Sequence, residues 1–222
     1  PVTLNAGEKR LLRLTPKELP ALHVLNPRLW WCNNMGEPNL YNISLEFEIQ
    51  NKASDKCNVT FGIREIKDYL TPEGYRGFLL NGRKVLIRGA GWTDDIFLRD
   101  TPSSYLHQIE FVKDMHLNTI RLESIWGNSD DIFNLCDRYG IMMLAGWSCQ
   151  WEWSDYIGGK EDQYTCISDS DKDLVADELR DQILWLRNHP SIIGWFVGSD
   201  KVPSPDMESR YRGIISTIDG RP

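Results

Sequence analysis

Residues 189–200 read His189-Pro190-Ser191-Ile192-Ile193-Gly194-Trp195-Phe196-Val197-Gly198-Ser199-Asp200. A proline cannot continue a helix, so Pro190 marks the end of a helix expected just before it. Residues 192–197 are apolar on both faces, which is typical of a parallel strand covered by helices. Asp200 therefore follows the carboxyl end of a buried strand, the place where barrels of alternating strands and helices carry their catalytic groups.

The residues around this stretch alternate between strand and helix patterns. Short apolar runs predict strands, and apolar residues at helical spacing predict the helices between them. The expected strands are 85–88, 119–122, 141–144 and 192–197, and the expected helices are 101–116, 130–139, 172–188 and 206–218. This order predicts an α/β fold with about four β/α units, whereas a closed (β/α)8 TIM barrel has eight. We expect residues 77–222 to form the N-terminal half of such a barrel and the sequence to stop halfway through it.

The first 76 residues lack helical periodicity. Residues 41–49 place five apolar side chains on one face and polar side chains on the other, which predicts a strand with one wet face. Antiparallel sheets of this kind are common in β-sandwiches, which take about seven strands over about 100 residues in the immunoglobulin type. We therefore expect residues 1–76 to be part of a β-sandwich, with open sheet edges through which the chain can self-associate.

The composition of the chain argues against some classes of binding partner. The net charge of −7 and a pI near 5.2 argue against nucleic acid and anionic membranes, which need a basic face. No apolar run approaches the roughly 20 residues that span a bilayer. The five cysteines are odd in number and show no CxxC spacing, so neither a zinc site nor a full disulfide framework is expected. No paired histidine spacing indicates a metal, and no cofactor is expected. The compartment is left open, with the periplasm or the exterior favoured over the cytoplasm.

Three motifs carry a resemblance to a known family. They are residues 189–200, the run Gly91-Trp92-Thr93-Asp94-Asp95-Ile96-Phe97-Leu98-Arg99, and Gly146-Trp147-Ser148-Cys149. With them, residues 77–222 resemble the barrel of family 2 of the glycoside hydrolases, and residues 25–31 and 62–66 resemble late strands of the immunoglobulin-like sandwich before it. Most members end the fourth strand in Gly-Asn-Glu, whereas Gly198-Ser199-Asp200 is similar to the exo-β-D-glucosaminidase branch.

The resemblance implies a fragment of a retaining, exo-acting β-glycosidase that removes glucosamine from chitosan oligosaccharides. Another specificity of the same family is the nearest alternative: β-mannosidase, endo-β-mannosidase acting on mannosyl-glycoproteins, or β-galactosidase. The expected partner is thus a carbohydrate with a β-linked amino sugar or mannoside. A hypothesis of another class is a non-catalytic sugar-binding or assembly module, since the change from Asn-Glu to Ser-Asp is also what a decaying site shows.

Asp200 is the candidate general acid/base. Glycosidic cleavage needs a carboxylic acid with a raised pKa, and the apolar residues 195–197 before it favour such a shift. Ser199 stands where the family has an asparagine that binds a sugar hydroxyl, so it is a candidate substrate contact. The structural alternative is that Asp200 caps the following helix.

Five further candidates for substrate binding follow the other strands: Asp94, Asp95, Arg121, Glu123 and Trp147. A carboxylate can bind the ammonium group of glucosamine by a charge-assisted hydrogen bond, and an indole can stack on a sugar ring. The structural alternatives are that Glu123 pairs with Arg121 or another base, that one aspartate is solvated, and that Trp147 only packs.

A retaining glycosidase needs a second carboxylate, the nucleophile, about 5 to 5.5 Å from the acid. The resemblance places this glutamate on a later strand, beyond Pro222. We therefore expect no turnover by the isolated chain.

Overall fold

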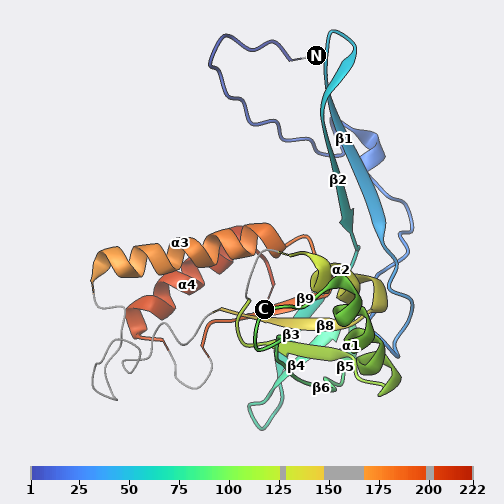
Figure 1. Cartoon of the computed structure of the whole chain (residues 1–222), viewed down its shortest axis with the longest axis vertical. Coiled ribbons are helices and arrows are strands. Elements are labelled where there is room, and N and C mark those ends of the chain that lie inside the picture. Colours follow the sequence, from blue (N-terminus) through green and yellow to red (C-terminus); the bar gives the residue numbers. More distant parts are fainter. Residues whose placement is uncertain (1, 126–128, 148–167, 199–202, 222) are drawn as a thin grey trace.

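The computed structural model describes residues 2–125, 129–147, 168–198 and 203–221. Its centre is a parallel sheet of four strands in the order β6-β7-β8-β9, which confirms the predicted half barrel (Figure 1). The strands are β6 (Gly89–Trp92), β7 (Thr119–Leu122), β8 (Met142–Gly146) and β9 (Ile192–Phe196). The helices between and after them are α1 (Pro102–Asp114), α2 (Asp131–Tyr139), α3 (Asp169–Leu186) and α4 (Pro205–Ile218).

The helix boundaries follow from local chemistry. Thr101 caps α1 through a hydrogen bond from the Ser104 amide to its hydroxyl, 3.1 Å long, and Ser168 and Ser204 cap α3 and α4 in the same way. Gly140 ends α2 with a φ of 71°, a left-handed conformation that glycine adopts without strain.

One face of the parallel sheet packs against all four helices. Ile120 and Leu122 from β7 and Ala145 from β8 meet buried residues of the helices, such as Phe133 and Leu179. This layer is the larger core, and it fixes the direction of the four strands relative to the helices.

The opposite face of the sheet is covered at its amino end by an antiparallel sheet and by the chain near Trp30. The antiparallel sheet has the order β3-β4-β5, with β3 at Ile66–Leu70, β4 at Arg76–Leu80 and β5 at Arg83–Val85. The second core contains six fully or nearly fully buried residues: Trp30, Cys32, Leu80, Val85, Met142 and Ile193. This second core therefore covers the amino end of this sheet face, and the carboxyl edge lies at the opposite end.

Strands β4 and β5 are joined by a tight hairpin turn, and the first barrel strand lies later than expected. Asn81 and Gly82 take positive φ angles of 49° and 77°, as a tight hairpin turn requires. The expectation of a barrel strand at 85–88 is wrong, because Val85 pairs with Phe78 in the hairpin and the first parallel strand is β6. A Cβ on Gly89 would lie 1.9 Å from the Thr119 carbonyl oxygen, so only glycine lets β6 approach β7 at this point.

The motif His189-Pro190-Ser191 anchors the amino end of β9. The buried carboxylate of Asp137 in α2 contacts His189 Nδ1 at 2.6 Å and accepts a hydrogen bond from the Ser191 amide at 3.0 Å. The guanidinium of Arg64 donates to the carbonyls of Pro190 and Ile192. Desolvation lowers the pKa of Arg64 to about 9. Residues of the predicted sandwich region, 1–76, thus pack directly on the parallel sheet. The domain boundary at 76/77 stays a prediction.

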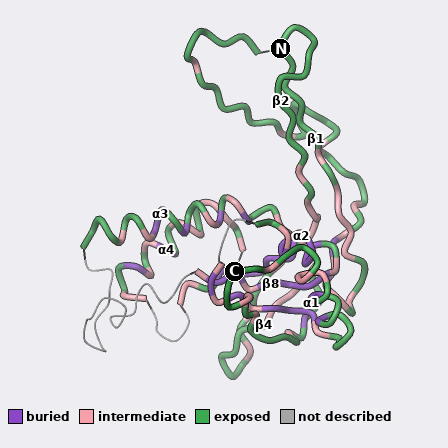
Figure 2. Tube along the Cα trace, in the orientation of Figure 1, coloured by how far each residue is buried: buried purple, intermediate pink, exposed green. Residues whose placement is uncertain are grey.

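The hairpin of β1 (Tyr41–Ile49) and β2 (Lys52–Phe61) projects away from the rest of the molecule (Figure 1). Tyr41 stacks on Phe61 at its base, with ring centroids 5.8 Å apart. Toward the tip its apolar side chains are exposed, and Figure 2 shows the contrast with the buried residues of the body. The N-terminal segment, which has a 3-10 turn at Pro20–Leu22, runs beside the hairpin before the chain enters the body at Trp30. The described part of the chain contains no helix long and apolar enough for a membrane span.

Candidate active site

The candidate site is the carboxyl edge of the parallel sheet. All four strands run in the same direction, so the residues that follow them lie along one edge. The structure brings Asp94, Asp95, Arg121, Glu123 and Trp147 to this edge, after or at the ends of β6, β7 and β8. Ser199 and Asp200, predicted to follow β9, lie outside the described residues, as does Ser148.

Asp94 is a half-buried carboxylate behind β6. Burial raises the pKa of Asp94, and the negative charge of Asp100 adds to this effect. The indole N–H of Trp92 opposes it, lying close enough to lower the pKa without completing a hydrogen bond. A carboxylate held in this way gains from a cationic partner, because the partner restores the stabilisation that water no longer gives.

Asp95 has a different environment from its neighbour. Its Oδ1 accepts hydrogen bonds from the amides of Phe97, at 3.0 Å, and Arg99, at 3.3 Å. Its own amide donates to Asp100 at 2.8 Å. The carboxylate therefore organises the turn after β6, which presents Phe97 to solvent with 70% of its surface exposed.

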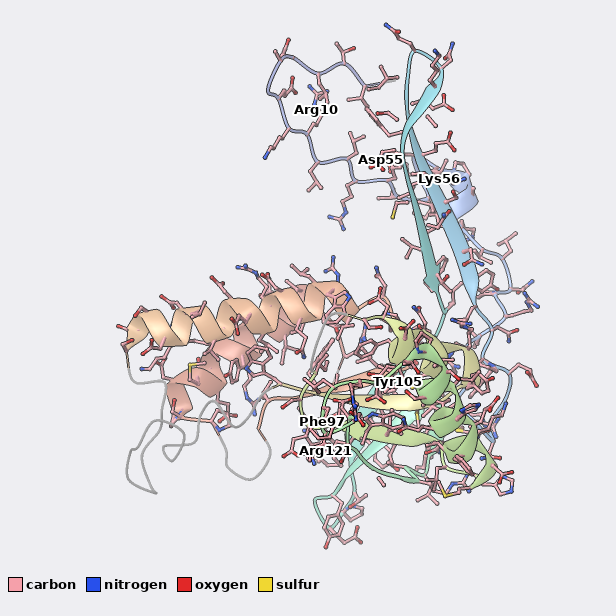
Figure 3. All side chains as sticks on the ribbon, in the orientation of Figure 1. Arg10, Asp55, Lys56, Phe97, Tyr105 and Arg121 are labelled. Atoms are coloured by element: carbon pink, nitrogen blue, oxygen red, sulfur yellow. The ribbon has the colours of Figure 1, made fainter. Side chains whose placement is uncertain are left out.

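Arg121 lies on the sheet face opposite the helices, at the middle of the site. Its neighbours in register are Gly91 and Leu144. The Arg121 guanidinium lies over the ring of Phe196, 5.3 Å from the centroid, which joins the ends of β7 and β9. Figure 3 shows Arg121, Phe97 and Tyr105 in the same part of the body.

Glu123 is half-buried directly after β7, where β8 passes close to the backbone. A Cβ on Gly146 would lie 2.2 Å from the carbonyl oxygens of Leu122 and Glu123, so the glycine holds this close approach. Glu123 and Arg121 each interact with another group in the structure. Whether Glu123 pairs with Arg121 stays a prediction.

Trp147 is fixed by contacts from two sides. Its backbone amide donates to the Phe196 carbonyl at 2.7 Å, and its indole N–H donates to the Tyr211 hydroxyl of α4 at 3.3 Å. Gln182 of α3 donates to the carbonyl of Gly146, the preceding residue, at 3.2 Å. The ring is thus held in one orientation while it stays partly exposed at the edge, as a sugar-stacking side chain must be.

Sequence reasoning did not find Tyr105, Gln182 or Tyr211. Each lies on a helix, one or two residues from apolar side chains, and a helical apolar pattern gives no sign that one polar group reaches the edge of the sheet. Within the described ranges no group of three or more His, Cys, Asp or Glu side chains is arranged to hold a metal ion.

A half barrel with carboxylates, an arginine and ordered aromatic rings at the carboxyl edge of its sheet has the architecture of the TIM-barrel enzymes. Residues 74–222 match the model of the TIM barrel domain of glycosyl hydrolases family 2, and residues 2–64 match a second model of glycosyl hydrolases family 2. The chain belongs to this family, and the resemblance seen in the sequence is confirmed.

Known relatives show which members of this family the chain is similar to. An exo-β-D-glucosaminidase of Streptomyces avermitilis is 36% identical over 220 residues, which are 98% of this chain and 24% of that protein. A mannosylglycoprotein endo-β-mannosidase of Lilium longiflorum is 33% identical over 204 residues, 89% of this chain and 21% of that protein. The exo-chitosanase of Amycolatopsis orientalis, solved in complex with PNP-β-D-glucosamine, superposes with a TM-score of 0.77 at 30% identity, over 88% of this chain and 23% of that one. The chain spans about a quarter of the length of these relatives.

Proposed function

We propose that residues 1–222 supply the acid/base and part of the sugar pocket of a retaining exo-β-D-glucosaminidase that acts on chitosan oligosaccharides. The observation that carries this proposal is the acidic edge of the parallel sheet, where Asp94 and Glu123 follow neighbouring strands. Two carboxylates there favour a sugar with an ammonium group over one with an acetamide or hydroxyl. The similarity to the Streptomyces avermitilis exo-β-D-glucosaminidase along nearly the whole chain supports the same choice.

In the proposed reaction Asp200 is the general acid. Its proton passes to the glycosidic oxygen as the bond from that oxygen to the anomeric carbon breaks, and a glutamate of the remaining barrel forms a bond to that carbon. Asp200, now a carboxylate, then takes a proton from water, which displaces the glutamate and releases the sugar. With this glutamate proposed to lie on a later barrel strand, residues 1–222 by themselves should bind sugar without turnover.

The other side chains divide the binding of the sugar. Asp94 and Glu123 are proposed to hold the amino group, with Asp95 fixing the turn that carries Asp94 and contacting the sugar from that turn. Ser199 and Arg121 are proposed to bind hydroxyl groups. Trp147 offers its face to the sugar ring, because its indole is already ordered by Tyr211.

A mannoside is the second candidate substrate. The identity of 33% to the Lilium longiflorum endo-β-mannosidase favours it, because that similarity covers most of the same residues. The two candidates share fold and reaction, so only the contacts to the sugar separate them. A non-catalytic sugar-binding module would share the pocket but not the acid.

The test joins this chain to the rest of a barrel. Residues 1–222 replace the matching segment of the Streptomyces avermitilis enzyme, and the chimera is assayed on p-nitrophenyl β-D-glucosaminide, on chitosan oligosaccharides and on β-mannosides. We expect cleavage of the glucosaminides. Absence of glucosaminide cleavage at every pH in a folded chimera would contradict the proposal, and cleavage of mannosides alone would favour the second candidate.

Asp200→Ala in that chimera identifies the acid. We expect kcat on chitosan oligosaccharides, whose leaving group is poor, to fall by about 100-fold or more, in line with the contribution of general acids. The p-nitrophenyl substrate should suffer less, since its leaving group needs little protonation. Equal rates for the variant and the parent on both substrates would remove Asp200 from the mechanism.

We also propose weak self-association through the β1–β2 hairpin, whose two edges are unpaired within the described residues. Sedimentation velocity of the isolated chain should show a concentration-dependent rise in mass. Phe47→Lys should abolish that rise, whereas a monomer at all concentrations would contradict the proposal.

A further inference from the structure

A small polar cavity lies behind Asp94, between the carboxyl ends of β6 and β7 and the helices α1 and α2. Its polar lining consists of Asp94, Tyr105, Ser124 and Ser129. Its volume is about 20 Å³. A cavity needs roughly 10 to 15 Å³ to admit one water molecule, so this one has room for a single water and for no sugar group.

Among the described residues next to this cavity, the indole nitrogen of Trp92 is fully buried and has no hydrogen-bond partner. Asp94 and Tyr105 line the cavity itself. The rings of Trp92 and Tyr105 lie against each other, with centroids 6.3 Å apart. Buried polar groups are almost always hydrogen-bonded, to protein or to ordered water.

We propose that the cavity binds one ordered water that accepts a hydrogen bond from the Tyr105 hydroxyl and donates one to the Asp94 carboxylate. Ser129, which donates its hydroxyl proton to Asp131 at 2.7 Å, still has a lone pair for the second proton of this water. Tyr105 is then a positioning residue, because it acts on Asp94 through the water. The role of Asp94 in binding an amino sugar rests on the proposed function, whereas the water site does not.

The charges around the cavity fit this arrangement. Burial raises the pKa of Tyr105 to about 12, and the carboxylates of Asp94, Asp100 and Asp131 add to the shift. The hydroxyl therefore stays protonated and remains a donor. Asp94 interacts with the Trp92 indole and with the charge of Asp100, and the water adds a neutral donor on the side of Tyr105.

A crystal structure of the 222-residue chain tests the site. We expect a density peak in the cavity about 2.7 to 3.0 Å from both Tyr105 Oη and an oxygen of Asp94. Tyr105→Phe keeps the ring against Trp92 and should remove the peak. A dry cavity in the parent chain, or an unchanged peak in Tyr105→Phe, would overturn the proposal.

The positioning role has its own readout, the pKa of Asp94 followed by carboxyl carbon NMR. In Tyr105→Phe we expect this pKa to rise, since the carboxylate loses a held donor, whereas Tyr75→Phe, on an exposed turn, should leave it unchanged. An Asp94 pKa that does not move would overturn the role. In the chimera, KM for the glucosaminide should rise by about 2- to 10-fold with kcat retained, the worth of one hydrogen bond. A lost water and a shifted pKa with unchanged KM would keep the site and contradict amine binding by Asp94.

Discussion

The β1–β2 hairpin and the parallel sheet are built from similar alternating or apolar strands but differ in what their side chains contact. In the sheet, Ile120 and Leu122 are 3% and 4% exposed, because helices cover them. In the hairpin, Leu45 and Phe47 are 47% and 50% exposed. The comparison teaches that a strand pattern predicts which side chains share a face, whereas the energy gained depends on whether another layer covers that face.

The largest effect should come from Gly89→Ala at the start of β6. The new methyl group would meet the Thr119 carbonyl oxygen of the neighbouring strand, so β6 must separate from β7. We expect a loss of about 4 kcal/mol or more in the free energy of unfolding, or failure to fold, because backbone cannot yield as a side chain can. Urea unfolding monitored by circular dichroism measures it.

Gly91→Ala is the matched control, two residues along the same strand. A Cβ at Gly91 meets nothing within 4 Å, so this variant should match the parent within about 1 kcal/mol. Equal losses at both positions would show that glycine is needed along β6 for another reason than the approach to β7.

Leucine truncation compares the two regions directly. Leu80 is fully buried in the core under the sheet, and Leu80→Ala should cost about 2 to 5 kcal/mol of unfolding free energy. Leu45→Ala in the hairpin should cost less than about 1 kcal/mol, since half of the side chain is already in water. If the two variants lost equal stability, the hairpin face would be covered in solution.

Asp137→Ala tests the anchor of β9. The variant leaves the buried amide of Ser191 and the ring of His189 without their acceptor, so we expect a loss of about 2 to 3 kcal/mol. Thr60→Val is the hairpin counterpart, because the Thr60 hydroxyl donates to Asn42 at an exposed position, 2.7 Å away. That variant should stay within about 0.5 kcal/mol of the parent, and a larger loss there than at Asp137 would reverse the ranking of the two regions.

The sequence was sufficient for the order of the barrel elements. Residues 119–122 form the expected strand, and Gly140 and Pro190 end helices where their backbone chemistry requires it. The first barrel strand was misplaced, because Val85 and Ile87 fit a buried strand as well as a hairpin arm. What decides between them is the distance from Gly89 to Thr119, and this contact joins residues too far apart for local pattern to reveal.

The site was predictable to the level of strand ends. The rule that parallel strands share a carboxyl edge was enough to gather Asp94, Arg121, Glu123 and Trp147. It could not separate Asp94 from Asp95, whose carboxylate bonds to the amides of its own turn. Adjacent identical residues differ here only in the direction of their side chains, which depends on the turn and on the packing of Trp92 against Tyr105.

The smallest expected effect is a pH dependence of stability that arises from Asp94, in the body of the molecule. The pKa of Asp94 is raised in the folded chain, first of all by burial, so the folded chain holds this proton more tightly than the unfolded chain does. Its contribution to stability is therefore greatest at low pH and is lost as the pH rises from about the unfolded value of 3.8 through the folded pKa. The side chain in Asp94→Asn cannot titrate. The melting temperature of this variant, relative to that of the parent, should therefore rise between pH 3 and pH 7. Thr93→Ala, next to it in the chain, changes no titratable group, so its melting temperature should depend on pH in the same way as that of the parent. If the melting temperature of Asp94→Asn also changed with pH as that of the parent does, burial would not govern the ionisation of Asp94. The difference between the buried body and the exposed hairpin would then not affect the ionisation of their side chains.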